Sequence, residues 1–306
     1  MKVITSYHGE DKLYTKVFVA SEQGFNVTST IICGKKECAL VDTQWTKANA
    51  LRVAAEILET GLELKWIFAT HAHPDHYWGL GEISRIFPEA KCFAPEPVVT
   101  LYHHQYQAKL DEWEDVIGCT NLARTQCDRL EALPGTELEL EGEKVQIIRC
   151  MGDLMWNTIA WIPSIKTVIA SDVLFNQAHP FTCEVTKDQR KLWMKDIEAI
   201  RDLGAEVIIP GHMREDLSLD ESSLTFMEQY LIATEEELER NQDAAGFFYA
   251  MFRRFPYATL LNYSNEMNAE VLLGGREWNW NEDPDPKWRE IPLAWQDDPL
   301  QGEENG

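Results

Sequence analysis

The stretch IFATHAHPDHYWG at residues 67–79 gathers three of the chain's eight histidines and one aspartate into six positions. His71 and His73 are two residues apart, so their side chains point to the same side of an extended segment. The proline after them turns the chain, which brings Asp75 and His76 round beside them. Imidazole nitrogens and carboxylate oxygens suit Zn²⁺, Mn²⁺ and Fe²⁺. The spacing therefore favours a site for divalent metal ions over a polar loop that is merely rich in histidine.

A pair of metal ions held by such residues would lower the pKa of a shared water molecule to about neutral. The resulting hydroxide could attack a carbonyl or phosphorus centre while the ions stabilise the developing oxyanion. A carboxylate such as Asp75 could hold the water and pass its proton to the leaving group. Since the chain has no GxSxG, P-loop or GxGxxG motif, the residues favour metal-dependent hydrolysis over serine-hydrolase, NTPase or dinucleotide chemistry.

The histidine stretch lies just after a predicted strand. The continuous apolar run at residues 66–69 is typical of a buried strand, and ligands usually bind beyond the carboxyl ends of strands in layered α/β folds. A helix is predicted before this strand, with Thr46 as its N-cap and Gly61 as its C-terminal cap. Its apolar stripe consists of Leu51, Ala54, Ala55 and Leu58. A shorter helix is predicted after the stretch, at residues 79–87.

The remaining core is predicted to mix strands and helices. Segments rich in Val, Ile and Thr open the chain and indicate β-hairpins. Further strands are predicted at residues 91–94, 136–140, 144–150, 158–162, 167–170 and 206–210, and helices at residues 97–117 and 188–203. The second of these helices has an apolar stripe of Leu192, Ala199, Ile200 and Leu203. Because strands outnumber crossover helices, we expect an α/β fold of two mixed β-sheets flanked by helices, at residues 1–215.

A helical extension is predicted at residues 216–275, packed on the core. One amphipathic helix is marked by Leu224, Met227, Leu231 and Leu238, and a second by Phe248, Phe252 and Phe255. The final segment, residues 276–306, is an acidic tail with four tryptophans, Trp278, Trp280, Trp288 and Trp295. The indoles could fill surface grooves as the tail wraps the core, or the tail could be poorly ordered.

The motif HAHPDH at residues 71–76 resembles the HxHxDH signature of the metallo-beta-lactamase superfamily. CALVDTQW with Asp42, VIASDVLF with Asp172 and IIPGHM with His212 resemble further segments of that family, in the same order and strand context. The resemblance runs from about residue 15 to residue 215 and implies a four-layer αβ/βα sandwich. It also implies that Asp172 bridges two metal ions and that His212 completes the site. We expect Asp42 to organise the site through hydrogen bonds or to cap a turn, without binding metal.

One position departs from the family pattern. The family normally has a histidine in a Gly-His turn before a strand, whereas Gly152 is followed here by Asp153. Carried over residue by residue, the resemblance implies a first site of His71, His73 and Asp153, a second of Asp75, His76 and His212, and Asp172 between them. We expect two zinc ions, but the hard oxygen of Asp153 would weaken selectivity for zinc and favour manganese or iron. If Asp153 is only a turn residue, the protein would run on one ion.

Asp75 and Asp172 are the expected catalytic carboxylates. Tyr77 and Trp78, directly after the motif, could wall a substrate pocket or pack in the core. Asn176 and His179, in the segment FNQAHPF after Asp172, resemble an Asn and a His-Pro near the cleft of similar hydrolases. We therefore place these four residues in the predicted substrate pocket.

Composition limits the partners. The chain has 28 Lys+Arg against 51 Asp+Glu and a formal net charge of -23, so nucleic acid and anionic membranes would be repelled. Its 7 cysteines form no CxxC pair, which is typical of reduced thiols, and the start lacks the apolar core of a signal peptide. We expect a cytoplasmic protein with a small-molecule substrate; the oligomeric state stays open, a dimer included.

The predicted reaction is the opening of a small-molecule amide or ester bond, in a cyclic lactam or lactone, as the resemblance implies. The nuclease branches of the family carry basic surfaces that this acidic chain lacks. Alternatives are a mononuclear iron sulfur dioxygenase or a thioesterase of the same fold, or a metal-poor binding protein without catalysis.

Overall fold

The computed structural model describes residues 1–9 and 12–278, and these residues form two mixed β-sheets. The first sheet has seven strands in chain order: β1 (Lys2–Ser6), β2 (Tyr14–Val19), β3 (Thr28–Cys33), β4 (Glu37–Val41), β5 (Glu63–Phe68), β6 (Lys91–Ala94) and β7 (Leu130–Ala132). Strands β1 to β4 pair antiparallel, and β4 to β7 pair parallel. The carboxyl ends of β4 and β5 therefore meet at one edge, where the histidine stretch begins.

The second sheet has the order β12-β11-β10-β9-β8. Its strands are β8 (Glu137–Leu140), β9 (Glu143–Cys150), β10 (Asn157–Ile162), β11 (Thr167–Asn176) and β12 (Val207–Met213). Only β11 and β12 pair parallel within the described part of this sheet. Both sheets are mixed, which confirms the predicted fold class.

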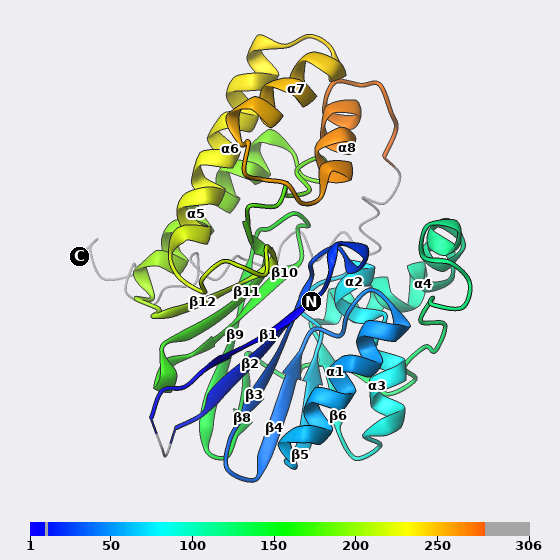
Figure 1. The fold of residues 1–306 in the computed structure, drawn as a ribbon, viewed down its shortest axis with the longest axis vertical. Coiled ribbons are helices and arrows are strands. Elements are labelled where there is room, and N and C mark those ends of the chain that lie inside the picture. The colour runs from blue at the N-terminus through cyan, green and yellow to red at the C-terminus, as the bar shows by residue number, and fades with distance from the viewer. Residues whose placement is uncertain (10–11, 279–306) are drawn as a thin grey trace, which may run out of the picture.

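Helices cover the outer faces of the sheets (Figure 1). The helices of the described chain are α1 (Lys47–Thr60), α2 (Pro74–Tyr77), α3 (Leu80–Ile86), α4 (Glu96–Ile117), α5 (Lys187–Asp202), α6 (Ser222–Arg240), α7 (Ala244–Arg254) and α8 (Asn262–Leu272), with short 3₁₀ turns at Glu22–Gly24 and Pro163–Ile165. Helices α1 to α4 lie on the side of the first sheet, and α5 to α8 gather at the other end of the molecule (Figure 1).

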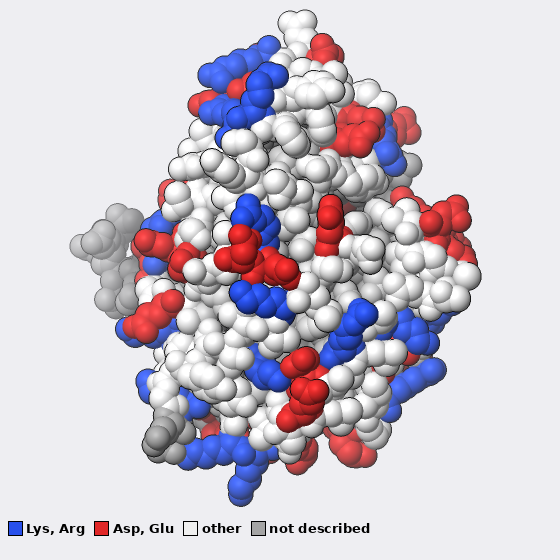
Figure 2. Space-filling model, viewed as in Figure 1, with Lys and Arg blue, Asp and Glu red and all other residues white. Residues whose placement is uncertain are grey.

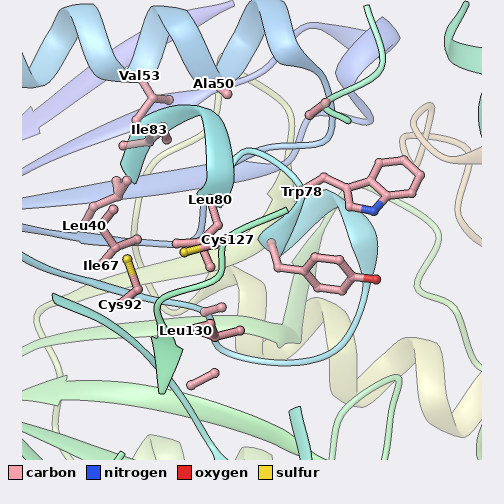
Figure 3. Packing of buried hydrophobic residues seen from close by; sticks show 14 of the residues in the cluster. Leu40, Ala50, Val53, Ile67, Trp78, Leu80, Ile83, Cys92, Cys127 and Leu130 are labelled. Atoms are coloured by element: carbon pink, nitrogen blue, oxygen red, sulfur yellow. The ribbon is translucent and has the colours of Figure 1, made fainter. Parts of the chain in front are cut away.

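Three apolar clusters lie between these layers and pack them together. Along β2, Val17 and Val19 pack between the two sheets, whereas Phe18 points to the helical side, as the two-residue period of a strand requires. The helical side of the first sheet includes Ile67 and Trp78 (Figure 3). A third cluster joins the second sheet to α5, α6 and α7. The layer order is helices, sheet, sheet, helices.

Helix α1 has the predicted caps: the Thr46 side chain accepts a hydrogen bond from the Asn49 amide, and Gly61 ends the helix with φ 70°. The predicted apolar stripe is wrong, because Leu51 and Leu58 are 44% and 61% exposed. The buried stripe is formed by Ala50, Val53, Ala54 and Ile57. Both sets have helical spacing, and packing against α3 and the sheet selects between them.

Helix α5 also buries a different stripe from the predicted one. Of the four predicted residues only Ile200 is fully buried, and it is joined there by Trp193 and Ile197. In α7 the buried residues are Phe247, Ala250 and Met251, whereas the predicted Phe252 is 43% exposed. In each helix, packing against the neighbouring elements decides which residues are buried, and local spacing does not encode this packing.

Strands β1 and β7 and helices α2 and α8 were not predicted, and strand β11 was predicted too short. Strands β1 and β7 are edge strands, which need few apolar residues. Helix α8 has four asparagine or serine residues, which are weak helix formers. Strand β11 continues to Asn176, because the polar residues that look like a strand end are buried there.

No helix among the residues that the structure describes is long and apolar enough to cross a membrane. Acidic and basic side chains are interspersed on the face shown in Figure 2. The tryptophans predicted to wrap the core at positions 280, 288 and 295 lie outside the described residues, and Trp278 is the last residue within them.

Candidate metal centre

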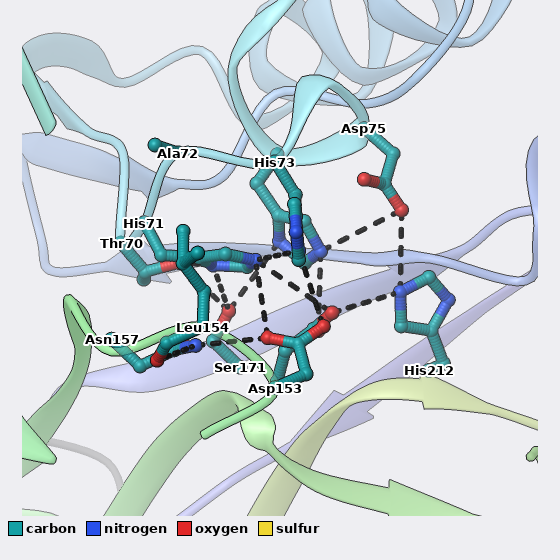
Figure 4. Close-up of polar contacts among 12 residues, drawn as sticks. Thr70, His71, Ala72, His73, Asp75, Asp153, Leu154, Asn157, Ser171 and His212 are labelled. Atoms are coloured by element: carbon teal, nitrogen blue, oxygen red, sulfur yellow. Dashed lines mark hydrogen bonds and ion pairs between the residues drawn. The ribbon is translucent and has the colours of Figure 1, made fainter. Parts of the chain in front are cut away.

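Four chain segments bring the predicted ligands together beside the carboxyl end of β5 (Figure 4). The loop after β5 carries His71 and His73, and the first turn of α2 carries Asp75 and His76. The loop before β10 supplies Asp153. Strands β11 and β12 supply Asp172 and His212.

The first group consists of His71, His73, Asp153 and Asp172, whose ligand atoms all lie within 4.8 Å of one another. His73 Nδ1 is 3.1 Å from Asp153 Oδ2 and 3.2 Å from His71 Nε2. Asp153 is 1% exposed, and its Oδ1 accepts a hydrogen bond of 3.0 Å from the Asn157 side chain. The carboxylate that departs from the family pattern therefore points at the two histidines.

The second group consists of Asp75, His76 and His212. Asp75 Oδ2 is 3.2 Å from His212 Nε2 and 3.7 Å from His76 Nε2. Asp172 lies between the groups: one oxygen is 3.1 Å from His76 Nε2, and the other is 3.3 Å from His212 Nε2 and 3.7 Å from His71 Nε2. This is the shared position that the sequence assigned to Asp172.

Asp42 fixes the ligands without facing the cavity. Its oxygens accept hydrogen bonds from the Thr70 amide at 2.9 Å, the Ser171 hydroxyl at 3.0 Å and His76 Nδ1 at 2.7 Å. Asp42 and Ser171 both have left-handed backbones, with φ 61° and 45°. Such conformations are costly for residues other than glycine and persist where surrounding contacts hold them. The prediction that Asp42 organises the site agrees with these contacts.

Two of the histidines also have a polar partner at the ring nitrogen that does not face the other ligands. His212 Nδ1 donates to the Phe25 carbonyl at 2.7 Å, and His73 Nε2 lies 3.2 Å from Glu184 Oε2. Partners of this kind fix the orientation of a metal-binding histidine. Glu184 was not predicted, because it lies in the loop after β11 and nothing in its sequence spacing connects it to His73.

The centre has the properties of a cation site. His76 Nε2 and Asp172 Oδ1 are buried and make no hydrogen bond within the described chain, although they are close neighbours. Buried polar atoms without partners are costly, and a cation between them would satisfy both. Gly211 is required beside them, since a Cβ atom there would lie 1.8 Å from Asp172 Oδ1. The donor set of imidazoles and carboxylates fits divalent transition metals.

The electrostatics agree with this fit. Burial and the neighbouring His76 hold the pKa of His71 well below its usual value. Burial also acts to lower the pKa of His212, but Asp172 and Asp75 outweigh it and raise that pKa to about 10. Burial raises the pKa of Asp153 to about 7, against the attraction of His73. The raised pKa of His212 shows that Asp172 and Asp75 stabilise positive charge beside them, as they would a bound cation.

The four residues predicted to line the substrate pocket do not line it. Tyr77 and Trp78 are 1% and 0% exposed and belong to the core beside the first sheet. Asn176 donates to the Ser222 hydroxyl, and His179 Nδ1 lies 2.8 Å from the Tyr230 hydroxyl. Both face the helical extension, because β11 runs on past the metal groups before the chain turns.

A cavity of about 680 Å³, counting the open space at its mouth, lies over the metal groups. Five residues of the metal groups line it: His73, Asp75, Asp153, Asp172 and His212. The other lining residues are Phe25, Trp45, Pro74, Lys109, Glu112, Trp113, Phe175, Phe181, Glu184, Leu261, Tyr263, Ser264 and Trp278.

Comparison with known proteins agrees with the fold and the motif. Residues 23–116 match the model of the metallo-beta-lactamase superfamily. Two curated proteins named hydroxyacylglutathione hydrolase, from two strains of Vibrio cholerae serotype O1, are 37% identical over 70 residues, which is 22% of this chain. The match spans about a quarter of those relatives, 26% of their length.

Solved structures share the architecture at low sequence identity. A metallo-beta-lactamase family protein from Thermus thermophilus is 21% identical, with a TM-score of 0.60 over 84% of this chain and 93% of that one. A metallo-beta-lactamase from Pontibacter korlensis is 16% identical, with a TM-score of 0.57 over 76% of this chain and 99% of that one. These structures define the fold as that of the metallo-beta-lactamases. Sequence similarity to the metallo-beta-lactamase superfamily itself covers residues 23–116.

Proposed function

We propose that the protein is a metal-dependent hydrolase that opens an amide or ester bond in a small molecule, with a cyclic lactam or lactone as the preferred class. The observation that carries this proposal is the pair of ligand groups that share Asp172 beneath the cavity. Divalent ions bound there would supply hydroxide near neutral pH and stabilise an oxyanion. We assign His71, His73 and Asp153 to one ion, and Asp75, His76 and His212 to the other, with Asp172 shared.

Residues at the cavity floor would transfer a proton and hold the ligand rings in place. Asp75 lines the cavity and is 8% exposed, so its carboxylate can accept a proton at the cavity floor and return it to a leaving group. His73 and His212 also line the cavity. Their other nitrogens are held by Glu184 and the Phe25 carbonyl, so both rings keep their orientation while a substrate is bound.

A thioester is the second candidate, and the similarity to proteins named hydroxyacylglutathione hydrolase supports it. The lining of the cavity argues against a glutathione thioester, which carries free carboxylates. Among the lining residues that the structure describes, Lys109 is the single Lys or Arg, whereas five carry carboxylates: Asp75, Glu112, Asp153, Asp172 and Glu184. With the charge of Asp75, Asp153 and Asp172 offset by bound ions, Glu112 and Glu184 remain, and they disfavour a substrate with several negative charges.

The test is a substrate panel of lactams, lactones, neutral thioesters and glutathione thioesters, with protein reconstituted separately with zinc, manganese and iron. We expect turnover of a lactam or lactone and a loss of at least about a hundredfold in kcat/KM for His71→Ala and for His212→Ala. The exposed His104→Ala serves as the control and should keep full activity. Full activity in either ligand variant would refute the proposal.

Oxygen uptake with a persulfide by the iron form, without hydrolysis of any member of the panel, would instead identify a sulfur dioxygenase. A protein that turns over neither class and binds no metal would be the non-catalytic alternative. We further propose that the protein has no nucleic acid or membrane partner, on the basis of the charge of -23. The free cysteines support an intracellular location.

A further inference from the structure

The cavity over the metal groups has an aromatic wall assembled from four separate parts of the chain. Phe25 precedes β3, Trp45 follows β4, Trp113 lies on α4 and Tyr263 lies on α8. The ring centroids of Phe25 and Trp45 are 4.6 Å apart, those of Trp45 and Trp113 are 5.0 Å apart, and those of Trp113 and Tyr263 are 5.9 Å apart. The rings therefore form one continuous apolar surface.

A second aromatic pair borders the same cavity. The centroids of Phe181 and Trp278 are 5.1 Å apart, and Phe181 meets the ring of His73 at 6.3 Å in an edge contact. Leu261 and Phe175 add aliphatic and aromatic surface between these groups and the metal ligands. An apolar group held here would lie directly beside the first metal group.

The helical extension supplies part of this surface. Leu261, Tyr263, Ser264 and Trp278 line the cavity and all come from beyond residue 216. Asn268 of α8, which is fully buried, accepts hydrogen bonds from the Thr182 and Cys183 amides at 2.8 and 3.0 Å and donates to the Pro180 carbonyl at 2.8 Å. These hydrogen bonds join the helical extension to the loop that carries Phe181 and Glu184.

The charged side chains of the lining leave little polar surface for a substrate to contact. Lys109 is 6% exposed and donates to the Ala72 carbonyl at 3.0 Å, so the one lining cation is tied to the backbone of the histidine stretch. The carboxylates of Asp75, Asp153 and Asp172 face the metal positions, and their charge would be offset by two divalent ions. The remaining free surface is mainly aromatic.

We propose that this pocket binds the apolar part of the substrate, and that the substrate is an uncharged amide or ester bearing an aryl group or a hydrocarbon chain of several carbons. Trp113 and Tyr263 are the contacts that determine this specificity. The assignment of the bond that is cut rests on the hydrolase function proposed above, whereas the binding of the apolar group does not.

Binding is tested without turnover by calorimetry, using N-alkyl acetamides from ethyl to decyl and the metal-loaded full chain. Each added methylene should tighten the Kd by about threefold to fourfold until the pocket is filled, with one molecule bound per chain. Tyr263→Ala should reduce this increment to less than about twofold, and Trp113→Ala should do the same. Trp113→Phe keeps an aromatic ring and should retain most of the gain in affinity per methylene. Circular dichroism checks that each variant folds.

Tyr257→Ala is the matched control, because Tyr257 is 71% exposed, belongs to the same extension and does not line the cavity. It should keep the wild-type increment. If Kd is independent of chain length, or if Tyr257→Ala and Tyr263→Ala lose the increment equally, the pocket assignment is wrong.

The same specificity can be measured in turnover, with lactones whose side chains have the same lengths as the alkyl groups of the acetamides. A rise in kcat/KM with chain length that is lost in Tyr263→Ala supports the proposal. Turnover that ignores chain length or prefers a substrate with several carboxylates overturns it. If no lactone or other member of the hydrolase panel is turned over but the acetamide increments are present, the hydrolase function fails while the apolar pocket stands.

Discussion

At the scale of single residues, Asp153 is the feature that most sets this centre apart from the family pattern. Its carboxylate lies 3.1 Å from His73 Nδ1, at a position where the resemblance to the family implies a histidine. A carboxylate is a harder ligand than an imidazole, so it shifts preference from zinc toward manganese and iron.

Asp153→His restores the family residue and should raise the ratio of zinc to manganese affinity by about tenfold. Competition titration with a chromophoric chelator measures both affinities. Asp153→Asn is the control, since it keeps the shape and removes the charge, and it should weaken both metals without reversing their order. An unchanged ratio in Asp153→His would show that residue 153 does not contact the metal.

His179 gives a prediction about pH. Burial lowers its pKa to about 4, with the Ala258 backbone opposing in part, whereas an unfolded chain protonates histidine near pH 6.5. The unfolded state therefore binds the proton first, and the contribution of neutral His179 to stability is lost as pH falls from about 6.5 toward 4. Between pH 7 and pH 5 this loss amounts to about 2 kcal/mol.

Urea unfolding of the wild type and of His179→Gln at these two pH values isolates this contribution. The variant is expected to be less stable at pH 7, because it loses the contact with Tyr230, but its free energy of unfolding should fall less on acidification. Parallel pH profiles for the two proteins would contradict a buried neutral imidazole.

The sequence was informative about the residues of the two candidate metal groups and uninformative about the residues that line the cavity. Ligands such as His71 and His76 are close in sequence and have few other uses at that spacing. Tyr77 and Trp78 are adjacent to the motif, yet an aromatic side chain there serves a core or a pocket equally well, and packing placed both in the core. Glu184 approaches His73 only through the tertiary fold.

At the scale of elements, α8 and the loop after β11 depend on one side chain. Asn268 makes three hydrogen bonds to the backbone of residues 180–183 and is fully buried. Helix α8 itself was missed because its asparagines weaken the helical pattern, and the buried ones have a structural purpose that only the fold shows.

Asn268→Ala should lower the free energy of unfolding by about 2 to 4 kcal/mol, because it leaves buried backbone groups without partners. Hydrogen exchange at the Thr182 and Cys183 amides should become faster. Asn262→Ala, at an exposed position on the same helix, should change neither quantity. Unchanged exchange in Asn268→Ala would mean that the loop is held by other contacts.

At the scale of the whole molecule, two sheets from distant parts of the chain converge on one centre. The first sheet contributes the histidine stretch and Asp42, and the second contributes Asp153, Asp172 and His212. The class of fold followed from the strand and helix pattern, because that pattern is repeated along the chain. Which helix face is buried did not follow, since it depends on how layers meet.

We propose that these two halves together hold two divalent ions, with Asp172 shared between them. Elemental analysis of protein purified without chelator, then dialysed against buffer free of added metal, tests it most directly. We expect about two transition-metal ions per chain in the wild type, and a loss of at least one of them in Asp172→Ala. Asp196→Asn, which changes a buried carboxylate outside both groups, should keep both ions. A folded wild-type protein without stoichiometric transition metal, or an Asp172→Ala variant with the full wild-type metal content, would contradict the account.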